Sequence, residues 1–482
     1  MLPLWSQEVK SHDIQCRLGE GVEFGKRTFR RMAQAPFMSR LSAIFSLSPV
    51  AKLLRNTAVR NTASSFIALG WLSLLSMISI PIYIRLLGVS EWGLVAACVS
   101  LQLVSNFVDS GFSQIVPRWV AREAQDNVKL RRYVQLFQRI YVALGLLVFV
   151  GLQIAAGCLA TSWFQVESGR TDALEMAIRI ISFQMLFQFV NNLHTGLWHG
   201  LQKQVLANIS ACGFGTLKHV ATMCALVFGP REAWLYATTF ALVALIEVVT
   251  NAIVVRRMLG GEGEIKEANQ ISIAPFLREV SILSGGILLG LIVSQLDRIM
   301  LSRSVSIEDF GIYAVVLTLA LAFLQLQTPF TRAYFPLIVQ DIQLTGHSSP
   351  AHIKRMVFGT IIFATLPAVF ACLFSESLLE LWIHESRFIA VGTFPLQLLL
   401  LAAATNTLYN CLYVLIIAAG KSHLVMKFNL VVLVVTVLVA TFAEPANGIV
   451  KGGMIWVAAT VTQLVLGLVW FVCHERSKAQ RH

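Results

Sequence analysis

The chain has 482 residues, of which 56% are apolar and only 13% are charged; its net charge is +12 and its mean hydropathy is +0.69. A soluble protein carries about 25% charged residues, because polar side chains must cover its surface. The composition therefore excludes an ordinary soluble enzyme, a disordered chain and a disulfide-rich secreted domain, and it indicates a polytopic membrane protein.

Residues 1–63 differ from the rest of the chain because they are mixed in polarity and rich in lysine and arginine. No uninterrupted apolar segment lies near Met1, so this stretch does not match a signal peptide. We expect a basic cytoplasmic N-terminal arm that is partly disordered.

Twelve apolar segments follow, each near the roughly 20 residues that a helix needs to cross a bilayer. The sequence predicts an N-terminal six-helix lobe over 64–255, with spans near 66–84, 92–115, 140–163, 177–199, 207–228 and 233–255. It predicts a C-terminal six-helix lobe over 280–474, with spans near 280–301, 311–331, 357–382, 388–418, 424–443 and 453–473. A cytoplasmic linker, 256–279, joins the lobes, and a cytoplasmic tail, 475–482, ends the chain. The expected fold is an all-α polytopic membrane protein.

Lysines and arginines predict the orientation, because they gather on cytoplasmic loops. With the N-terminus inside, and leaving the arm aside, 19 basic residues fall on cytoplasmic segments and 7 on the opposite side. We therefore expect a multi-pass protein of the cell inner (cytoplasmic) membrane with both termini in the cytoplasm. The positive net charge then reflects loops that set orientation, and no nucleic-acid partner is expected.

The two halves repeat each other at a nearly constant spacing. Gly93 and Gly311 open the second and eighth spans 218 residues apart, and Gly200 and Gly420 precede the fifth and eleventh spans 220 residues apart. Six spans per half give both halves the same orientation in the bilayer. Such parallel repeats are related by an axis along the membrane normal, and their substrate site lies between them.

Several short motifs resemble one transporter superfamily. They are 81–88 (PIYIRLLG), 91–94 (EWGL), 109–112 (DSGF), 117–118 (PR), 295–298 (QLDR), 310–313 (FGIY) and 420–421 (GK). Across roughly residues 60–475 the chain resembles the multidrug/oligosaccharidyl-lipid/polysaccharide exporter (MOP) superfamily, and within it the polysaccharide transporter family of Wzx-like flippases. The resemblance implies a MATE-like fold and a polyprenyl-pyrophosphate-linked oligosaccharide as substrate. It also implies membrane lipids as partners, together with polysaccharide polymerase and chain-length proteins.

Ionisable residues inside apolar spans are costly, so they mark ion pairs or cavities. Lys218 and Glu247 lie on adjacent antiparallel spans, at depths that differ by roughly 4–5 Å. Two interpretations stay open. Either the two side chains form a structural ion pair, or Lys218 faces a cavity and binds an anionic headgroup.

Further polar residues complete the candidate site. Three arginines are additional candidates for contact with phosphate: Arg118, Arg298 and Arg332. Gln184, Gln188 and Asn191 form one helical stripe, whose amides match either sugar hydroxyls or neighbouring helices. Three carboxylates are candidates for a coupling proton or sodium ion, with local structural roles as the alternative: Asp109, Glu247 and Asp297.

The sequence contains no Walker A, Gly-x-Ser-x-Gly or His-Glu-x-x-His pattern, and its cysteines lack metal-ligand spacing. We predict a flippase with no catalytic residue, cofactor or metal, which moves lipid-linked repeat units for lipopolysaccharide or exopolysaccharide biosynthesis. One alternative is a cation-coupled multidrug exporter of the same fold. Another is a membrane-embedded glycosyl transferase or polymerase, which would need a larger extracytoplasmic loop than this chain provides.

Overall fold

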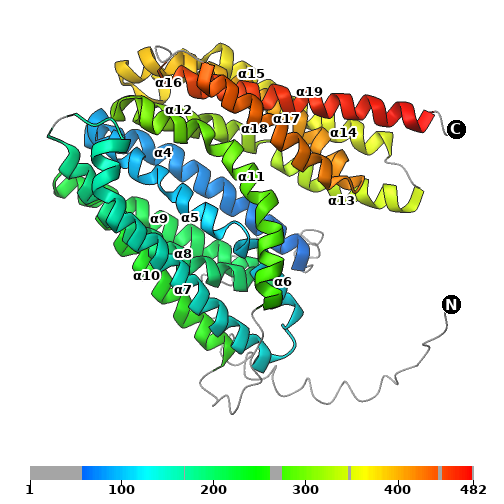
Figure 1. Cartoon of the computed structure of the whole chain (residues 1–482), viewed down its shortest axis with the longest axis horizontal. Coiled ribbons are helices and arrows are strands. Elements are labelled where there is room, and N and C mark those ends of the chain that lie inside the picture. Colours follow the sequence, from blue (N-terminus) through cyan, green and yellow to red (C-terminus); the bar gives the residue numbers. More distant parts are fainter. Residues whose placement is uncertain (1–56, 168, 261–273, 346–348, 443–447, 480–482) are drawn as a thin grey trace, which may run out of the picture. The chain divides into compact units, whose positions relative to one another are not determined.

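The computed structural model describes residues 57–167, 169–260, 274–345, 349–442 and 448–479, and in this part of the chain the regular secondary structure is helical apart from one isolated bridge between Gln165 and Ser306 (Figure 1). The all-α prediction is confirmed. Ser65–His482 form one unit, which holds both predicted lobes except residue 64. Most of the expected arm, the centre of the linker and the end of the tail lie outside the described residues.

The described part of the first half forms seven α-helices and a short π-helix. They are α4 (Thr57–Ser100), α5 (Gln102–Asp109), α6 (Phe112–Arg122), α7 (Asn127–Cys158), η1 (Leu159–Trp163), α8 (Thr171–Gly200), α9 (Gln204–Phe228) and α10 (Ala233–Leu259). α7 begins after Asp126, whose carboxylate accepts hydrogen bonds from the backbone N–H groups of Lys129 and Val128. Those bonds cap the helix and hold the pKa of Asp126 below its usual range.

The second half, in its described residues, contains nine α-helices and a second π-helix. They are α11 (Ala274–Ser304), α12 (Ile307–Gln325), α13 (Thr328–Thr345), α14 (Pro350–Thr360), η2 (Ile361–Thr365), α15 (Leu366–Leu373), α16 (Ser375–Ile383), α17 (Ser386–Ala418), α18 (Ser422–Phe442) and α19 (Val450–Ala479). The expected span 357–382 is divided, because α15 ends at Leu373 and α16 begins at Ser375.

Ten helical segments of the described chain are long and apolar enough to cross a membrane. The first of them, Arg60–Asp109, contains the expected span 66–84 and most of the expected span 92–115, and a φ of 78° at Gly88 breaks the helix between them. The expected span 280–301 lies in α11, which is not among the ten. The count of twelve therefore stays a prediction, although the helical architecture agrees with it.

α11 links the two halves of the chain. Near its start, the ring of Phe276 packs against Phe137 and Trp119 of the first half, with centroid distances of 4.7 and 5.7 Å. Glu279 accepts a hydrogen bond of 2.8 Å from Trp119 Nε1, while Val293 packs in a cluster with residues of α18 and α19. The first turns of α11 are thus fastened to the first half and its later turns to the second.

The two halves also meet at a seam where α4 crosses α12. A Cβ atom on Gly93 would lie 2.5 Å from the carbonyl oxygen of Ile307, and one on Gly311 would lie 2.9 Å from the Cα atom of Gly93. Close by, Ser90 Oγ donates to Glu308 Oε1 at 3.1 Å. Both Gly93 with Gly311 and Ser90 with Glu308 are 218 residues apart, so positions related by the repeat touch each other. That is the pattern expected around a two-fold axis.

Candidate functional site

Lys218 and Glu247 form an ion pair inside the first half. Lys218 Nζ on α9 lies 2.8 Å from Glu247 Oε2 on α10, and the two side chains are only 13% and 8% exposed. The same ammonium donates to Gln188 Oε1 on α8 at 3.4 Å. The charge of Lys218 is therefore compensated in this structure, as the ion-pair interpretation requires.

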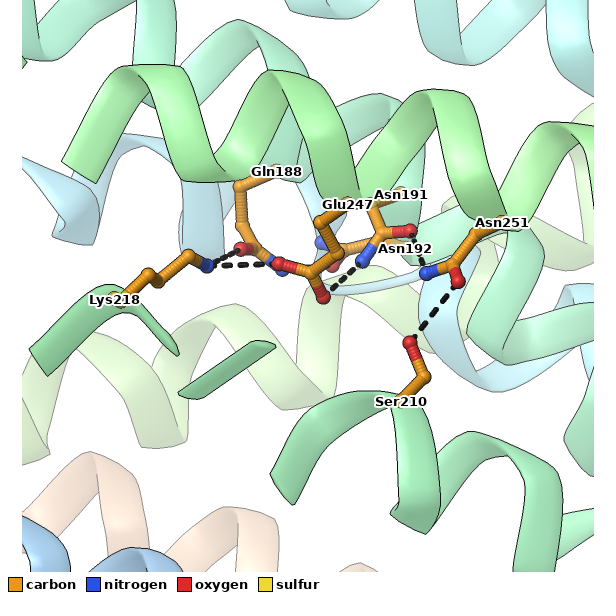
Figure 2. A network of polar contacts seen from close by, with 7 residues as sticks. All are labelled: Gln188, Asn191, Asn192, Ser210, Lys218, Glu247 and Asn251. Carbon is orange, nitrogen blue, oxygen red and sulfur yellow. Dashed lines mark hydrogen bonds and ion pairs between the residues drawn. The ribbon is translucent and has the colours of Figure 1, made fainter. Parts of the chain in front are cut away.

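A chain of hydrogen bonds extends from this ion pair through the amides of α8 and α10 (Figure 2). Asn191 Nδ2 donates to Glu247 Oε1 at 2.9 Å, and Asn251 Nδ2 donates to Asn191 Oδ1 at 2.8 Å. Ser210 Oγ on α9 then donates to Asn251 Oδ1 at 3.0 Å. This amide network fastens α8, α9 and α10 to one another, because each buried polar atom that joins it avoids the cost of an unpaired group.

The network continues toward Asp109 in the other direction. Gln188 Nε2 lies 3.5 Å from Asn192 Oδ1, and Asn192 Nδ2 donates to Asp109 Oδ2 at 3.0 Å. The structure thus brings together Gln188, Asn191, Lys218, Glu247 and Asp109, which the sequence analysis selected separately. Gln184 lies on the same stripe of α8 but stays outside the network, and its buried Oε1 has no hydrogen-bond partner among the described residues.

Asp297 and Arg298 occupy a second polar centre, near the seam between the halves. Asp297 is buried, with 1% exposure, and its Oδ2 accepts a short hydrogen bond from the hydroxyl of Tyr313 on α12. Arg298 points elsewhere. Its guanidinium donates to Gln295 Oε1 at 3.0 Å, and no carboxylate of the described residues lies within 4.0 Å of it.

Arg298 lines a cavity of about 230 Å³ between helices of both halves. Aromatic side chains form much of its wall: Tyr83, Trp92, His219, Tyr236, Phe310 and Tyr313. Hydroxyl groups of Ser76, Ser100 and Thr318 also line it. Of the described residues around this aromatic cavity, Arg298 alone carries a permanent charge.

Sequence reasoning selected Arg298 but missed the aromatic wall around it. Tyr83 is the centre of that wall: its hydroxyl lies 2.9 Å from His219 Nδ1, and its ring packs edge-on against Tyr236 at 5.2 Å. Aromatic residues are common in apolar spans, so none of them stands out in the sequence as an ionisable residue does. The one signal that was present is that Tyr83, Trp92, Phe310 and Tyr313 all lie in the resemblance motifs 81–88, 91–94 and 310–313.

The remaining candidates lie outside the aromatic cavity. Arg118 on α6 and Arg332 on α13 are exposed, and Arg332 lies over the ring of Phe66 at 5.7 Å. Lys218 does not line the cavity either, although its neighbour His219 does. Among the described residues, no group of three or more His, Cys, Asp or Glu side chains is placed to hold a metal ion.

Comparison with known proteins gives one family and a consistent fold. The family model described as "Polysaccharide biosynthesis protein" matches residues 58–341. The lipid II flippase MurJ in an inward closed conformation has a TM-score of 0.66 at 12% identity, over 86% of this chain and 87% of that one. A multidrug resistance MATE family transporter of the MOP superfamily, in an inward-facing conformation, has a TM-score of 0.60 at 11% identity, over 85% and 95%.

The Vibrio cholerae MATE transporter VcmN has a TM-score of 0.59 at 14% identity, over 89% of this chain and 98% of that one. No curated protein sequence matches the chain. At these identities the solved structures establish only the fold, which this chain shares with them.

Proposed function

The chain belongs to the polysaccharide biosynthesis protein family, and from this premise we propose that it is a flippase for lipid-linked oligosaccharide repeat units. In this proposal it lies in the cytoplasmic membrane with both termini inside, and it supplies the synthesis of a surface polysaccharide or exopolysaccharide. A saccharide joined to pyrophosphate cannot cross hydrocarbon unaided, because its polar groups would lose their water without gaining partners.

The aromatic cavity around Arg298 is the observation that carries this proposal. A guanidinium free of a carboxylate partner can hold phosphate oxygens through two parallel hydrogen bonds. Aromatic faces suit the apolar C–H faces of sugar rings, and hydroxyl groups suit their edges. One cation in an aromatic and hydroxyl-lined cavity is therefore the chemistry that a phosphate-linked saccharide needs.

The seam at Gly93 and Gly311 supports a proposal for the end of the molecule from which the substrate headgroup enters. It closes the molecule at the end where Arg170 pairs with Glu91 and where Ile307 N–H donates to the carbonyl of Gln165 at 3.0 Å. In the proposed orientation this is the outer end. The headgroup would enter from the cytoplasmic end while its lipid tail stays in the bilayer, and rocking of the halves would then part the seam.

The other candidate residues take distinct roles in the proposal. Lys218 and Glu247 hold α9 to α10 through their ion pair, and the amides Gln188 and Asn191 support that pair. Arg298 is the headgroup ligand, and Asp297, which is buried beside it, is the candidate for a coupling ion. Membrane lipids and the enzymes that polymerise the exported repeat unit are the expected partners.

A multidrug exporter of the same fold is the alternative: the aromatic faces of the cavity suit lipophilic cations, whereas the Arg298 guanidinium in its lining repels them. Deletion of the gene separates the two functions. We expect surface polysaccharide to be lost and lipid-linked repeat units to accumulate, with both restored by the intact gene. Unchanged polysaccharide together with increased drug sensitivity would instead identify an exporter.

A further inference from the structure

A second cavity lies within the C-terminal half and has a different chemistry from the first. Its volume is about 290 Å³, and residues of α11, α12, α17, α18 and α19 line it. The polar side chains around it are uncharged: Ser294, Asn406, Asn429, Thr460 and Gln463. The indole of Trp456 and a few aliphatic side chains complete the lining of this amide cavity.

The amides of this cavity keep much of their hydrogen-bonding capacity free. Asn406 Nδ2 lies 3.4 Å from Gln463 Oε1, which leaves Asn406 Oδ1 and Gln463 Nε2 without a partner among the described residues. Asn429 has no hydrogen-bond partner among them at either end of its amide. An amide without a partner costs several kcal/mol in hydrocarbon, so these free amide groups are suited to water or to a polar ligand.

The first half provides an internal comparison, because α8, α9 and α10 are the repeat counterparts of α17, α18 and α19. In the first half, the amides of these helices are occupied by the ion pair of Lys218 and Glu247. The positions 220 residues later hold Leu438 and Gly467, so the second half lacks both charges. Where one half has a closed network, the other has a polar cavity.

One side chain connects the amide cavity to the surroundings of the proposed phosphate site. Trp456 lines the amide cavity and also packs against the core cluster that contains Tyr313 and Phe310, both of which line the aromatic cavity. Amides donate and accept at once, as sugar hydroxyls do, and an indole face matches the apolar face of a sugar ring. A carboxylate would find no cation among the lining residues to offset its loss of water.

We propose that the amide cavity binds a neutral sugar residue of the transported saccharide and rejects uronic acids. This inference rests on the proposed flippase function and adds to it a class of sugar. Asn406, Asn429 and Gln463 bind the hydroxyls, and Trp456 packs against the ring.

The test measures binding of free sugars to the full chain in lipid nanodiscs by saturation-transfer NMR. The probes are the methyl glycosides of glucose, galactose and N-acetylglucosamine, with methyl glucuronide as the acidic probe. We expect a signal from at least one neutral probe and none from the glucuronide. That signal should fall at least five-fold in Asn429→Leu and in Gln463→Leu. Two variants are used so that the test still stands if one of them fails to fold.

Asn410→Leu is the matched control, because Asn410 lies on α17 one turn from Asn406 but does not line the cavity. Its signal should equal that of the wild type. Absence of any neutral-sugar signal, an unchanged signal in Asn429→Leu, or an equal signal from the glucuronide would overturn the sugar site. None of these outcomes would contradict the proposed flippase function, which is tested by flipping with the wild-type chain. Sugar binding by a chain that does not flip the substrate would overturn only the proposed function.

Discussion

Lys218 is the residue whose role differs between the two interpretations, an ion pair with Glu247 and a ligand of the substrate headgroup. A lysine inside a membrane is tolerated when a partner offsets its charge or when water and an anion reach it. In the structure, Glu247 lies 2.8 Å away and both side chains are largely buried. Its position therefore favours an ion pair, and Arg298 is left as the cation that lines the cavity.

Substitution of either member of this pair should destabilise the fold. Lys218→Met or Glu247→Gln leaves one buried charge without its partner, which costs about 3–5 kcal/mol. The double variant should recover most of this loss, since the amide introduced by Glu247→Gln keeps an acceptor for Asn191. Thermal unfolding of the four purified proteins in detergent measures the effect. If the double variant is stable but both variants that lack Lys218 export no polysaccharide, Lys218 would be a substrate ligand.

The limits of sequence reasoning are also clearest at single residues. Ionisable side chains stand out in an apolar span, so Lys218, Glu247, Asp297 and Arg298 were all found. Whether two of them pair depends on the rotation of each helix about its axis, which hydropathy does not determine. Tyr83, Trp92 and Asn429 have ordinary residue types for membrane helices, so only the packed structure reveals that they line cavities.

Among the elements, the long apolar helices were predicted closely. The expected spans 388–418 and 424–443 correspond to α17 (Ser386–Ala418) and α18 (Ser422–Phe442). α11 differs, because its first turns belong to the expected linker and carry Phe276 into the aromatic cluster of the first half. This packing joins residues that are far apart in the sequence, so no local sequence pattern predicts it.

The seam between α4 and α12 gives a prediction at the same scale. Gly93→Ala places a methyl group against the Ile307 carbonyl, so the helices must separate, at a cost of about 1–3 kcal/mol. We expect a cysteine introduced at Ser90 to react faster with a membrane-impermeant maleimide when Gly93→Ala is present. Gly151→Ala is the control, since a Cβ atom there meets nothing within 4 Å. Equal labelling rates in the two backgrounds would show that close contact at Gly93 does not keep the seam closed.

At the scale of the whole molecule, the ends of the helices and the loops between them form two groups. Contacts are made within each group. Contacts at one end join Arg387 with Asp309 and Trp163 with Ser302, while those at the other join Arg122 and Trp119 with Glu279. The sequence analysis assigned the first group to the outside and the second to the cytoplasm from the distribution of basic residues. The contacts agree with this grouping, and the orientation of the two ends remains a prediction.

Cysteine labelling determines that orientation. In a cysteine-depleted background, an impermeant reagent applied outside intact cells should label Arg170→Cys and Arg387→Cys. Under the same conditions it should leave Lys129→Cys and Lys354→Cys unlabelled until the membrane is permeabilised. The opposite pattern would invert the topology and place the closed seam in the cytoplasm.

The central claim is that Arg298 binds the phosphate of a lipid-linked saccharide, and a flipping assay tests it most directly. The substrate is a fluorescent oligosaccharide joined to polyprenyl pyrophosphate, in proteoliposomes that contain the full chain. Arg298→Gln should slow flipping about ten-fold or more, because charge-assisted hydrogen bonds are lost. Arg298→Lys should keep part of the rate, and Arg303→Gln, an exposed residue on the same helix outside the aromatic cavity, should keep all of it. Flipping by Arg298→Gln at the wild-type rate would contradict the account.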